Sequence, residues 1–325
     1  MKVSFVIPAY NAAKTVCRCL DSVIAQTDGE WEAVVIDDGS SDNTYELISS
    51  YAEKDCRIIA LTQENQGPGL TRNNAMARAT GDYVAFLDSD DYVEKDYLAL
   101  VKEKIEREEL DVVVIDNFYE TPDGRLIRME RLSRFAGLCT EELIAVQMTG
   151  KMPWGGWRKV VRADLIKKNG IEYSKDAVGE EAVFSFNVFY HASRIGFLGA
   201  PVLHYVDYPT SQSKKGNDDP WGPVVDRLLA HLEKNGLLTQ YQRPLNSFAY
   251  TALAVSAYRI SKNHRFFEAV SLVSGKIKET KQKYKCRCDR ACLERRVRLL
   301  MPLIRANLAF LIVLAARLFG GKALK

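Results

Sequence analysis

The sequence predicts an α/β fold, in which a doubly wound, mostly parallel, Rossmann-like sheet is followed by a helical C-terminal extension. Three observations support this prediction. Apolar, β-branched runs alternate with segments of helical spacing between residues 3 and 115. The runs are apolar almost throughout, as expected for strands that helices cover on both faces. A polar cluster follows each of the first four runs, and such sheets bind ligands at the carboxyl ends of their strands.

The individual elements follow from the same periodicities. The expected strands and helices alternate in chain order: 3–7, 12–26, 32–36, 44–54, 57–61, 70–79, 83–87, 95–107 and 111–115. Residues 117–161 have no regular pattern, 182–192 have helical spacing, and 203–213 are expected to form a polar, aromatic connector. From Asp226 onward the spacing is helical.

Composition and charge indicate a globular protein with two contrasting parts. The 325-residue chain is 47% hydrophobic and 27% charged, as in folded proteins. From Lys276 onward there are 14 basic and 3 acidic residues, whereas residues 1–275 carry 31 basic and 39 acidic ones. The basic tail predicts an anionic surface as its partner. We expect one domain over residues 1–220 and a helical, basic region over residues 221–325.

The cysteines indicate the compartment. Seven cysteines are scattered without the regular spacing of a disulfide framework, which favours a reducing, cytoplasmic environment. Cys286, Cys288 and Cys292 lie close together, but no second cysteine pair or nearby histidine accompanies them, so a zinc site is not expected. The first apolar run is short and is interrupted by Pro8, which argues against a secretory signal.

The basic tail contains an apolar segment. Its uninterrupted part, residues 306–316, would be about 16 Å long as a helix, against roughly 30 Å of membrane hydrocarbon, so it is too short to span a bilayer. Such a helix after a basic stretch is typical of proteins that lie on an anionic leaflet. We therefore expect residues 276–325 to hold the protein on the inner face of the cell membrane. Packing onto the body or onto a partner subunit is the alternative.

Three carboxylates follow the apolar run at residues 83–87. Asp88 and Asp90 are two residues apart, so strand periodicity directs both into one small volume, and Asp91 follows directly. Such oxygen donors suit Mg²⁺ or Mn²⁺, which in turn can neutralise a diphosphate. An acidic turn that caps the next helix is the alternative. The sequence lacks the glycine-rich motifs of nicotinamide and P-loop sites, which disfavours both.

Four segments resemble, in order, the motifs of the inverting family 2 glycosyltransferases, which have the GT-A fold. They are VSFVIPAYN, VVIDDGSSDNT, ENQGPGLTRNNAM and GDYVAFLDSDD, at residues 3–11, 34–44, 64–76 and 81–91. The resemblance implies a donor half over residues 1–116 and an acceptor half over residues 117–220. Later segments are similar only in pieces: PWGGWRKVVRADLI, and the stretch that begins Gly-Glu-Glu at Gly179.

The resemblance implies a role for each matching residue of the donor half. The residues expected to bind the nucleotide-sugar are Pro8, Tyr10, Asp38, Asn65, Gly67, Arg72, Asp88 and Asp90. Asp38 would accept a hydrogen bond from the uracil. Asp90 would bind Mn²⁺ or Mg²⁺ directly, and Asp88 would approach the ribose or the same metal ion.

The resemblance also implies a catalytic base and an acceptor side. Glu181 stands where the family usually has an aspartate base, with Glu180 directly before it, and a carboxylate in this role takes the proton of the acceptor hydroxyl. Asp91 is expected to support the loop or to bind on the acceptor side. Trp154 and Trp157 stand beside glycines and basic residues and are expected on the acceptor side, as a platform for a sugar ring. The two tryptophans are equally well explained as anchors of the hydrophobic core.

Together, these expectations describe a metal-dependent, inverting hexosyl- or N-acetylhexosaminyltransferase. It would use a UDP-sugar and a glycan acceptor, expected to be lipid-linked, in the assembly of a cell-surface polysaccharide such as capsule or O-antigen. Nucleic acid is not an expected partner, because the tail contains no recognisable binding module. A nucleotidyltransferase would need a more basic loop than PAYNAAKTV after the first strand. A non-catalytic nucleotide-sugar-binding or scaffold protein is the remaining alternative, favoured by the glutamate at position 181.

Overall fold

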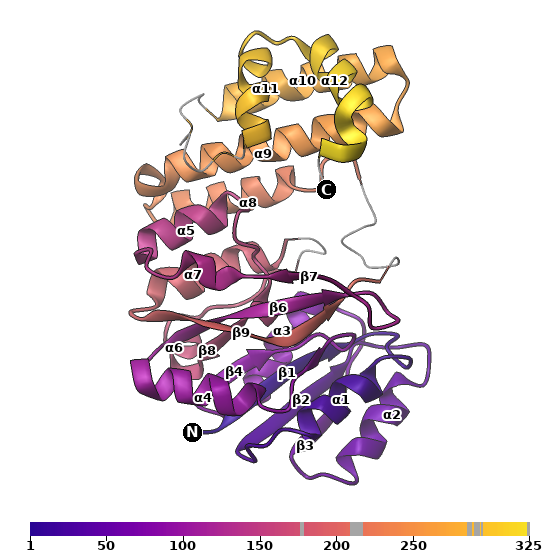
Figure 1. Cartoon of the computed structure of the whole chain (residues 1–325), viewed down its shortest axis with the longest axis vertical. Helices are drawn as coiled ribbons and strands as arrows, with labels where there is room; N and C mark the ends of the chain where they lie inside the picture. The colour runs from indigo at the N-terminus through magenta and orange to yellow at the C-terminus, as the bar shows by residue number, and fades with distance from the viewer. Residues whose placement is uncertain (176–178, 209–216, 285–287, 289–292, 294, 324–325) are drawn as a thin grey trace. The chain divides into compact units, whose positions relative to one another are not determined.

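The computed structural model describes residues 1–175, 179–208, 217–284, 288, 293 and 295–323. Two compact units are present (Figure 1). The first, which we call the sheet unit, consists of Met1–Thr140 and Gly155–Ser211, and the second, the helical unit, consists of Glu141–Trp154 and Gln212–Lys325. Cys286 and Cys292 lie outside the described residues, so the expected absence of a zinc site stays a prediction.

The first half of the sheet has the predicted doubly wound arrangement. Its strands run parallel in the order β3-β2-β1-β4, with bounds Val3–Ala9 (β1), Trp31–Asp37 (β2), Ile58–Thr62 (β3) and Tyr83–Phe86 (β4). The helices between them are α1 (Val16–Ile24), α2 (Thr44–Ala52) and α3 (Pro68–Arg78). All residues of β2 and β4 are buried, which explains why these strands are apolar or aromatic almost throughout.

The second half of the sheet is mixed rather than mostly parallel. It continues from β4 in the order β8-β6-β9-β5, with bounds Lys159–Arg162 (β8), Val112–Glu120 (β6), Ile195–Val206 (β9) and Tyr92–Val93 (β5). Strand β8 is antiparallel to both β4 and β6, and β5 is antiparallel to β9, whereas β9 is parallel to β6. Strand β8 follows a short 3-10 turn, Gly156–Arg158, and not the crossover helix that a parallel connection requires.

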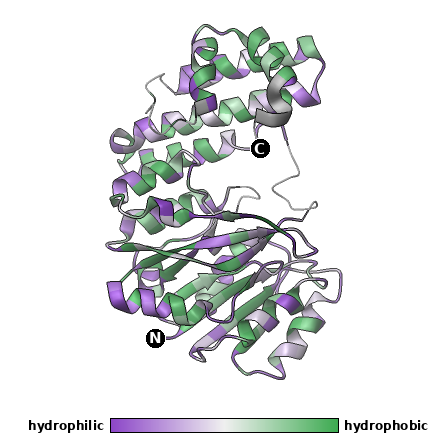
Figure 2. Cartoon of the chain, in the orientation of Figure 1, coloured by the Kyte–Doolittle hydropathy of each residue, from purple (hydrophilic) through white to green (hydrophobic). Residues whose placement is uncertain are grey.

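The middle of the chain is more regular than predicted. Besides β8, residues 117–161 contain an edge strand, β7 (Leu126–Glu130), and a helix, α5 (Thr140–Met148), and β9 includes the first residues of the expected connector. Helices α4 (Tyr97–Glu108), α6 (Ala163–Lys168) and α7 (Glu181–His191) complete the sheet unit. The core of this unit lies between the sheet and its helices, and hydrophobic residues concentrate along the strands (Figure 2).

The helical unit confirms the predicted helical extension. Its main helices, with α5, are α8 (Gly222–Lys234), α9 (Leu238–Asn263), α10 (Phe266–Lys283), α11 (Arg295–Arg305) and α12 (Ala309–Ala323). Buried residues of α9, α10, α11 and α12 form one hydrophobic cluster, so the tail packs against the preceding helices. Among the described helices, none combines the length and the apolar character needed to cross a membrane.

Candidate active site

The polar strand ends lie at one edge of the sheet. Ala9 at the end of β1 pairs with Asp37 at the end of β2, and Asp37 pairs with Thr62 at the end of β3. On the other side of β1, the backbone N–H of Leu87 donates to the carbonyl of Val6, which continues the parallel pairing just beyond β4. The loops after the four strands therefore meet at the same edge, as the sequence predicted.

Asp38 organises the loop that precedes α3. Its side chain is buried, and its two carboxylate oxygens accept hydrogen bonds from the Gln63 side chain at 2.8 Å and from the backbone N–H groups of Gln66 and Gly67 at 2.9 Å. A carboxylate offers about four acceptor sites, so three are used within the protein and one remains for a ligand. Gly67 has φ of 85°, a conformation that favours glycine.

The loop after β1 presents an aromatic side chain at the same edge. The Tyr10 side chain is 49% exposed, although it directly follows a buried strand. The backbone N–H of Asn11 donates to the Ser40 hydroxyl, and the Asn11 side chain accepts from the N–H of Ser41, so the loops after β1 and β2 hold each other. Pro8 lies near the end of β1, and Asn65 lies in the loop after β3, where its side chain donates to the Asp38 carbonyl at 2.9 Å.

The three aspartates after β4 converge. Asp88, Asp90 and Asp91 each offer one carboxylate oxygen within 4.8 Å of the others. Asp91 is buried. One of its oxygens accepts from the N–H of Val206 at 2.9 Å, and the other is buried without a hydrogen-bond partner among the described residues. A buried carboxylate oxygen without a partner is costly unless a proton or a cation satisfies it.

Electrostatics in this cluster fit a divalent cation. Burial, and then the neighbouring Asp88, raise the pKa of Asp90 to about 6. Burial, and then Asp90 and Asp88, raise the pKa of Asp91 well above its usual value. Closely spaced carboxylates repel one another, and a bound cation relieves that repulsion. The donor set, all carboxylate oxygen, is the kind that Mg²⁺ and Mn²⁺ prefer.

Arg72 connects this cluster to the two glutamates at the start of α7. Its buried guanidinium donates to Asp88 at 2.7 Å and to Glu180 at 3.2 Å, and it lies over the ring of Tyr173 at 5.3 Å from the ring centre. A guanidinium offers its donors in a rigid planar fork, so both carboxylates are held in fixed directions. The sequence had indicated Arg72 as a ligand of the nucleotide, but not this bridge.

Glu180 and Glu181 differ in their surroundings. Burial, and then the adjacent Glu181, raise the pKa of Glu180 to about 7. One oxygen of Glu181 accepts from the backbone N–H of Gly156 at 2.9 Å, and its second oxygen has no hydrogen-bond partner among the described residues. A Cβ at Gly156 would come within 2.0 Å of the Tyr173 hydroxyl, so a larger residue at this position would displace the Tyr173 ring.

The two tryptophans are packing residues. Trp157 is buried in the core of the sheet unit, stacks on Tyr205 with ring centres 5.0 Å apart, and lies beneath the guanidinium of Arg158. Trp154 is buried within the helical unit, where it packs near Phe248 at 6.0 Å. The structure therefore supports their alternative role as core anchors, while a contact with the acceptor stays a prediction.

The sequence did not indicate two residues that pack around the candidate site, Tyr173 and His204. Tyr173 stacks on Phe184 at 3.9 Å beneath Arg72, and His204 stacks on Tyr92 at 4.2 Å. The His204 ring nitrogens lie 2.9 Å from carboxylate oxygens of Glu120 and Glu94, which ties β9 to β6 and to the residue that follows β5. No local pattern distinguishes either residue, because their partners are distant in the chain.

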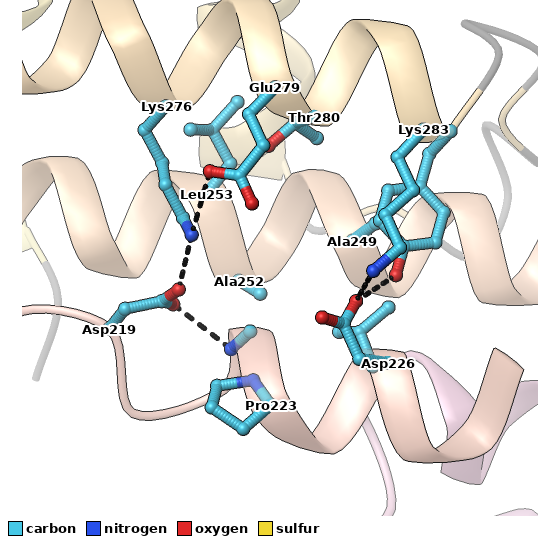
Figure 3. Close-up of a pocket in the computed structure, with 13 residues that line it drawn as sticks. Asp219, Pro223, Asp226, Ala249, Ala252, Leu253, Lys276, Glu279, Thr280 and Lys283 are labelled. Atoms are coloured by element: carbon cyan, nitrogen blue, oxygen red, sulfur yellow. Dashed lines mark hydrogen bonds and ion pairs between the residues drawn. The ribbon is translucent and has the colours of Figure 1, made fainter. Parts of the chain in front are cut away.

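The helical unit has its own small cavity, shown in Figure 3, of about 180 Å³. Lys276 lies 2.6 Å from Asp219, and Lys283 lies 2.6 Å from Asp226, so ion pairs join α10 to α8 and to the segment before it. None of the expected site residues lines this cavity. The ion pairs also neutralise two of the tail's lysines, so the charge that the tail offers to a partner is smaller than its composition indicated.

Known proteins resemble this chain in sequence and in fold. Residues 4–169, roughly half of the chain, match the family model described as "Glycosyl transferase family 2". Glycosyltransferase EpsJ of Bacillus subtilis, which is named as uncharacterized, is 28% identical over 257 residues, covering 78% of this chain and 71% of EpsJ. Glycosyltransferase GlyA of Streptococcus pneumoniae is 39% identical over 262 residues, covering 75% of this chain and 36% of GlyA. The crystal structure of S. aureus TarS in complex with UDP-GlcNAc has the same fold, with a TM-score of 0.72 at 21% identity, over 98% of this chain and 92% of that one.

Proposed function

Because this chain belongs to glycosyl transferase family 2 and has the GT-A fold, we propose that it is a metal-dependent, inverting glycosyltransferase that moves a sugar from a UDP-sugar to a hydroxyl group of a lipid-linked glycan. The product would be part of a cell-surface polysaccharide such as capsule or O-antigen. One observation carries the proposal: three carboxylates converge at the same sheet edge as the buried Asp38, and one oxygen of Asp91 has no hydrogen-bond partner among the described residues.

The donor would be held at the ends of β1 and β2. Asp38 keeps one acceptor site for the N–H of uracil, and the exposed Tyr10 offers an aromatic face for the base. Gly67 and Arg72 would border the diphosphate. A UDP-sugar is supported by the TarS complex with UDP-GlcNAc, which makes an N-acetylhexosamine the first sugar to test, with a hexose next.

Asp90 and Asp88 would hold Mn²⁺ or Mg²⁺. When bound, the cation supplies a Lewis acid that neutralises the negative charge of the departing diphosphate. Asp91 lies against the same volume and supports the loop through its bond to the N–H of Val206. Arg72 adds positive charge beside Asp88, where it would contact the diphosphate as well.

Glu181 would act as the base, with Glu180 as the alternative. The free oxygen of Glu181 would take the proton of the acceptor hydroxyl while the hydroxyl oxygen bonds to the anomeric carbon and the bond from that carbon to UDP breaks. One displacement of this kind inverts the anomeric configuration. Glu180 is engaged by Arg72, which would fix the start of α7 and thereby the direction of Glu181.

The helical unit would place the enzyme on the inner face of the cell membrane. Helix α12 buries Ala309, Ile312 and Val313 in the unit's core. Four large apolar side chains of the same helix are exposed: Phe310, Leu311, Leu314 and Leu318. Exposed arginines precede them at 296, 298 and 305. An apolar helix face beside arginines fits an anionic leaflet, so membrane association through 276–325 is part of the proposal.

The test is UDP release from a panel of UDP-sugars with Mn²⁺, in the wild-type protein and in Asp90→Ala. We expect one donor to be turned over, with turnover reduced at least about 100-fold in the variant, because an electrostatic group of this kind typically contributes that much. Turnover equal to wild type in Asp90→Ala would reject the metal role. Mn²⁺-dependent UDP binding without turnover on any acceptor would favour the non-catalytic alternative.

A further inference from the structure

The β6–β7 hairpin of the sheet unit is apolar where a surface hairpin is usually polar. Leu126, Ile127 and Met129 are 50%, 47% and 43% exposed. These three aliphatic side chains lie within four consecutive residues of β7. Isolated exposed apolar residues are ordinary, whereas a contiguous group of this kind indicates an interaction site.

Both faces of β7 are open to solvent. Side chains alternate along a strand, so Ile127 and Met129 lie on one face and Leu126 and Arg128 on the other. All four are exposed. In the part of the chain that the structure describes, β7 pairs with β6 alone. The hairpin therefore projects an apolar strand whose two faces are open.

Basic residues surround these apolar side chains. Residues 121–134 contain four arginines and two acidic residues. One acidic residue, Glu130, is already paired with Arg158 of the sheet unit, with Nε and Oε2 at 2.8 Å. Arg128 lies over the ring of Tyr119 at 3.8 Å, and neither it nor Arg125 forms an ion pair among the described residues. The hairpin thus combines aliphatic side chains with unneutralised positive charge.

This combination favours a lipid surface over a second copy of the chain. In a symmetric antiparallel pairing of two β7 strands, Arg128, the central residue, would lie opposite its own copy, and like charges in that position are destabilising. One strand partner would also leave both apolar faces exposed. A leaflet that contains anionic lipids accepts the aliphatic side chains from either face and attracts the arginines.

The hairpin is also tied to the candidate active site. Arg158 donates to Glu130 at 2.8 Å and to the Tyr119 hydroxyl at 2.6 Å, so it holds both strands of the hairpin. Two residues earlier in the same turn, the N–H of Gly156 donates to Glu181. A contact made by the hairpin therefore has a fixed position relative to the proposed base.

We propose that the β6–β7 hairpin is a second membrane contact, located in the sheet unit, which inserts Leu126, Ile127 and Met129 into an anionic leaflet. Only one part of this inference rests on the proposed function, namely that the contact brings the active site to a membrane that carries the acceptor. Binding to the leaflet itself requires no donor, metal ion or acceptor, so the two proposals can fail separately.

The test measures co-sedimentation of the full chain with vesicles of phosphatidylcholine alone and of phosphatidylcholine with phosphatidylglycerol. Ile127→Ser/Met129→Ser is expected to weaken partition to the anionic vesicles by about tenfold or more. Arg125→Gln and Arg128→Gln are each expected to weaken it about fivefold, with no effect on neutral vesicles. Matched controls are Ile24→Ser and Arg78→Gln, two exposed positions of the same unit outside the hairpin, which should bind as wild type does.

The same hairpin variants are also made in a Leu314→Ser/Leu318→Ser background, which removes the contribution of α12. Residual binding should fall again when the hairpin is changed. Hairpin variants that partition like the controls in both backgrounds would overturn the inference. Unchanged vesicle binding with a fall in molecular mass from dimer to monomer would also overturn it, in favour of strand pairing between copies. A urea denaturation midpoint equal to that of the wild type confirms that the hairpin variants are folded.

Discussion

Replacing Asp90 by asparagine should stabilise the protein while removing its response to metal. In the absence of a cation, burial and then the neighbouring Asp88 raise the pKa of Asp90 in the folded protein from 3.8 to about 6. The folded state therefore binds the extra proton between these two pH values, and stability falls as pH rises from about 4 to about 6. A pKa raised by about two units lowers the free energy of unfolding by about 3 kcal/mol at any pH above that range. Asparagine carries no charge, so we expect Asp90→Asn to gain about 1–3 kcal/mol at pH 7.5.

Urea denaturation in a chelator, followed by tryptophan fluorescence, measures this gain. Near pH 4 the difference between Asp90→Asn and wild type should disappear, because Asp90 is then protonated in the folded protein. Adding Mn²⁺ at about 100 times its dissociation constant should stabilise the wild type by about 2.7 kcal/mol. It should stabilise the variant much less, since a ligand of the ion has been lost.

The matched control is Asp28→Asn. The pKa of Asp28 is lowered, against the effect of its burial, by hydrogen bonds from Lys102 and from the backbone of Glu30. This carboxylate stabilises the fold when charged, so its replacement should destabilise the protein at pH 7.5. The reasoning is refuted if Asp90→Asn is no more stable than wild type in the chelator, or if both variants change stability in the same direction.

Four further predictions concern other parts of the account. Asp38→Ala leaves the hydrogen-bond donors of Gln63 and of the following loop unpaired. Calorimetry should then show no UDP binding, and urea denaturation should show that the free energy of unfolding falls by about 2–4 kcal/mol; retained UDP affinity would contradict this. Gly156→Ala displaces the Tyr173 ring, so turnover should fall by more than tenfold while UDP affinity is kept; equal losses of both would place Gly156 in donor binding. The raised pKa of Glu180, about 7, means that stability falls as pH rises from about 4.5 to 7, and urea denaturation of Glu180→Gln should show a flatter pH dependence; an unchanged profile would reject the shift. Leu314→Ser/Leu318→Ser should lower binding to anionic vesicles by about tenfold without loss of UDP binding; wild-type partition would exclude α12 as an anchor.

The last variant tests the tail more cleanly than a deletion of residues 276–325 would. The structure shows that α10, α11 and α12 share a hydrophobic core with α9. Removing them would expose buried residues such as Ile260 and would confuse loss of membrane binding with loss of folding. Substitutions at exposed positions of α12 avoid that difficulty.

The donor half of the fold was predictable because its signals are local. An apolar run such as β2 is buried on both faces, and its neighbours in the sheet, β1 and β3, are the strands directly before and after it in the chain. The spacing also predicted that Asp88 and Asp90 converge, but the structure brings them together in a turn after β4, where the N–H of Asp91 donates to the carbonyl of Asp88, and not through the alternation of an extended strand. Asp91 joined the cluster because the chain turns there, which alternation does not predict.

The rest of the site depends on contacts between distant residues. Strand β8 pairs antiparallel with β4 and β6 after a short 3-10 turn, so it does not follow the alternation of parallel strands and crossover helices that predicted β1 to β4. Arg72 contacts Glu180, which is 108 positions away in the sequence. Tyr173, whose ring lies beneath Arg72, is not part of a periodic apolar pattern that would have marked it as a site residue. Charge counting is incomplete for a similar reason, since it does not show that Lys276 and Lys283 are paired with aspartates of another segment.

The dependence of UDP binding on Mn²⁺ tests the central claim most directly. Calorimetry on the wild-type protein should show UDP affinity at least about tenfold higher with Mn²⁺ than with a chelator, because the cation offsets the repulsion between the diphosphate and the carboxylates. Asp90→Ala should bind UDP with no such difference. Equal affinity with and without Mn²⁺ in the wild type, or an undiminished effect of Mn²⁺ in Asp90→Ala, would contradict the account.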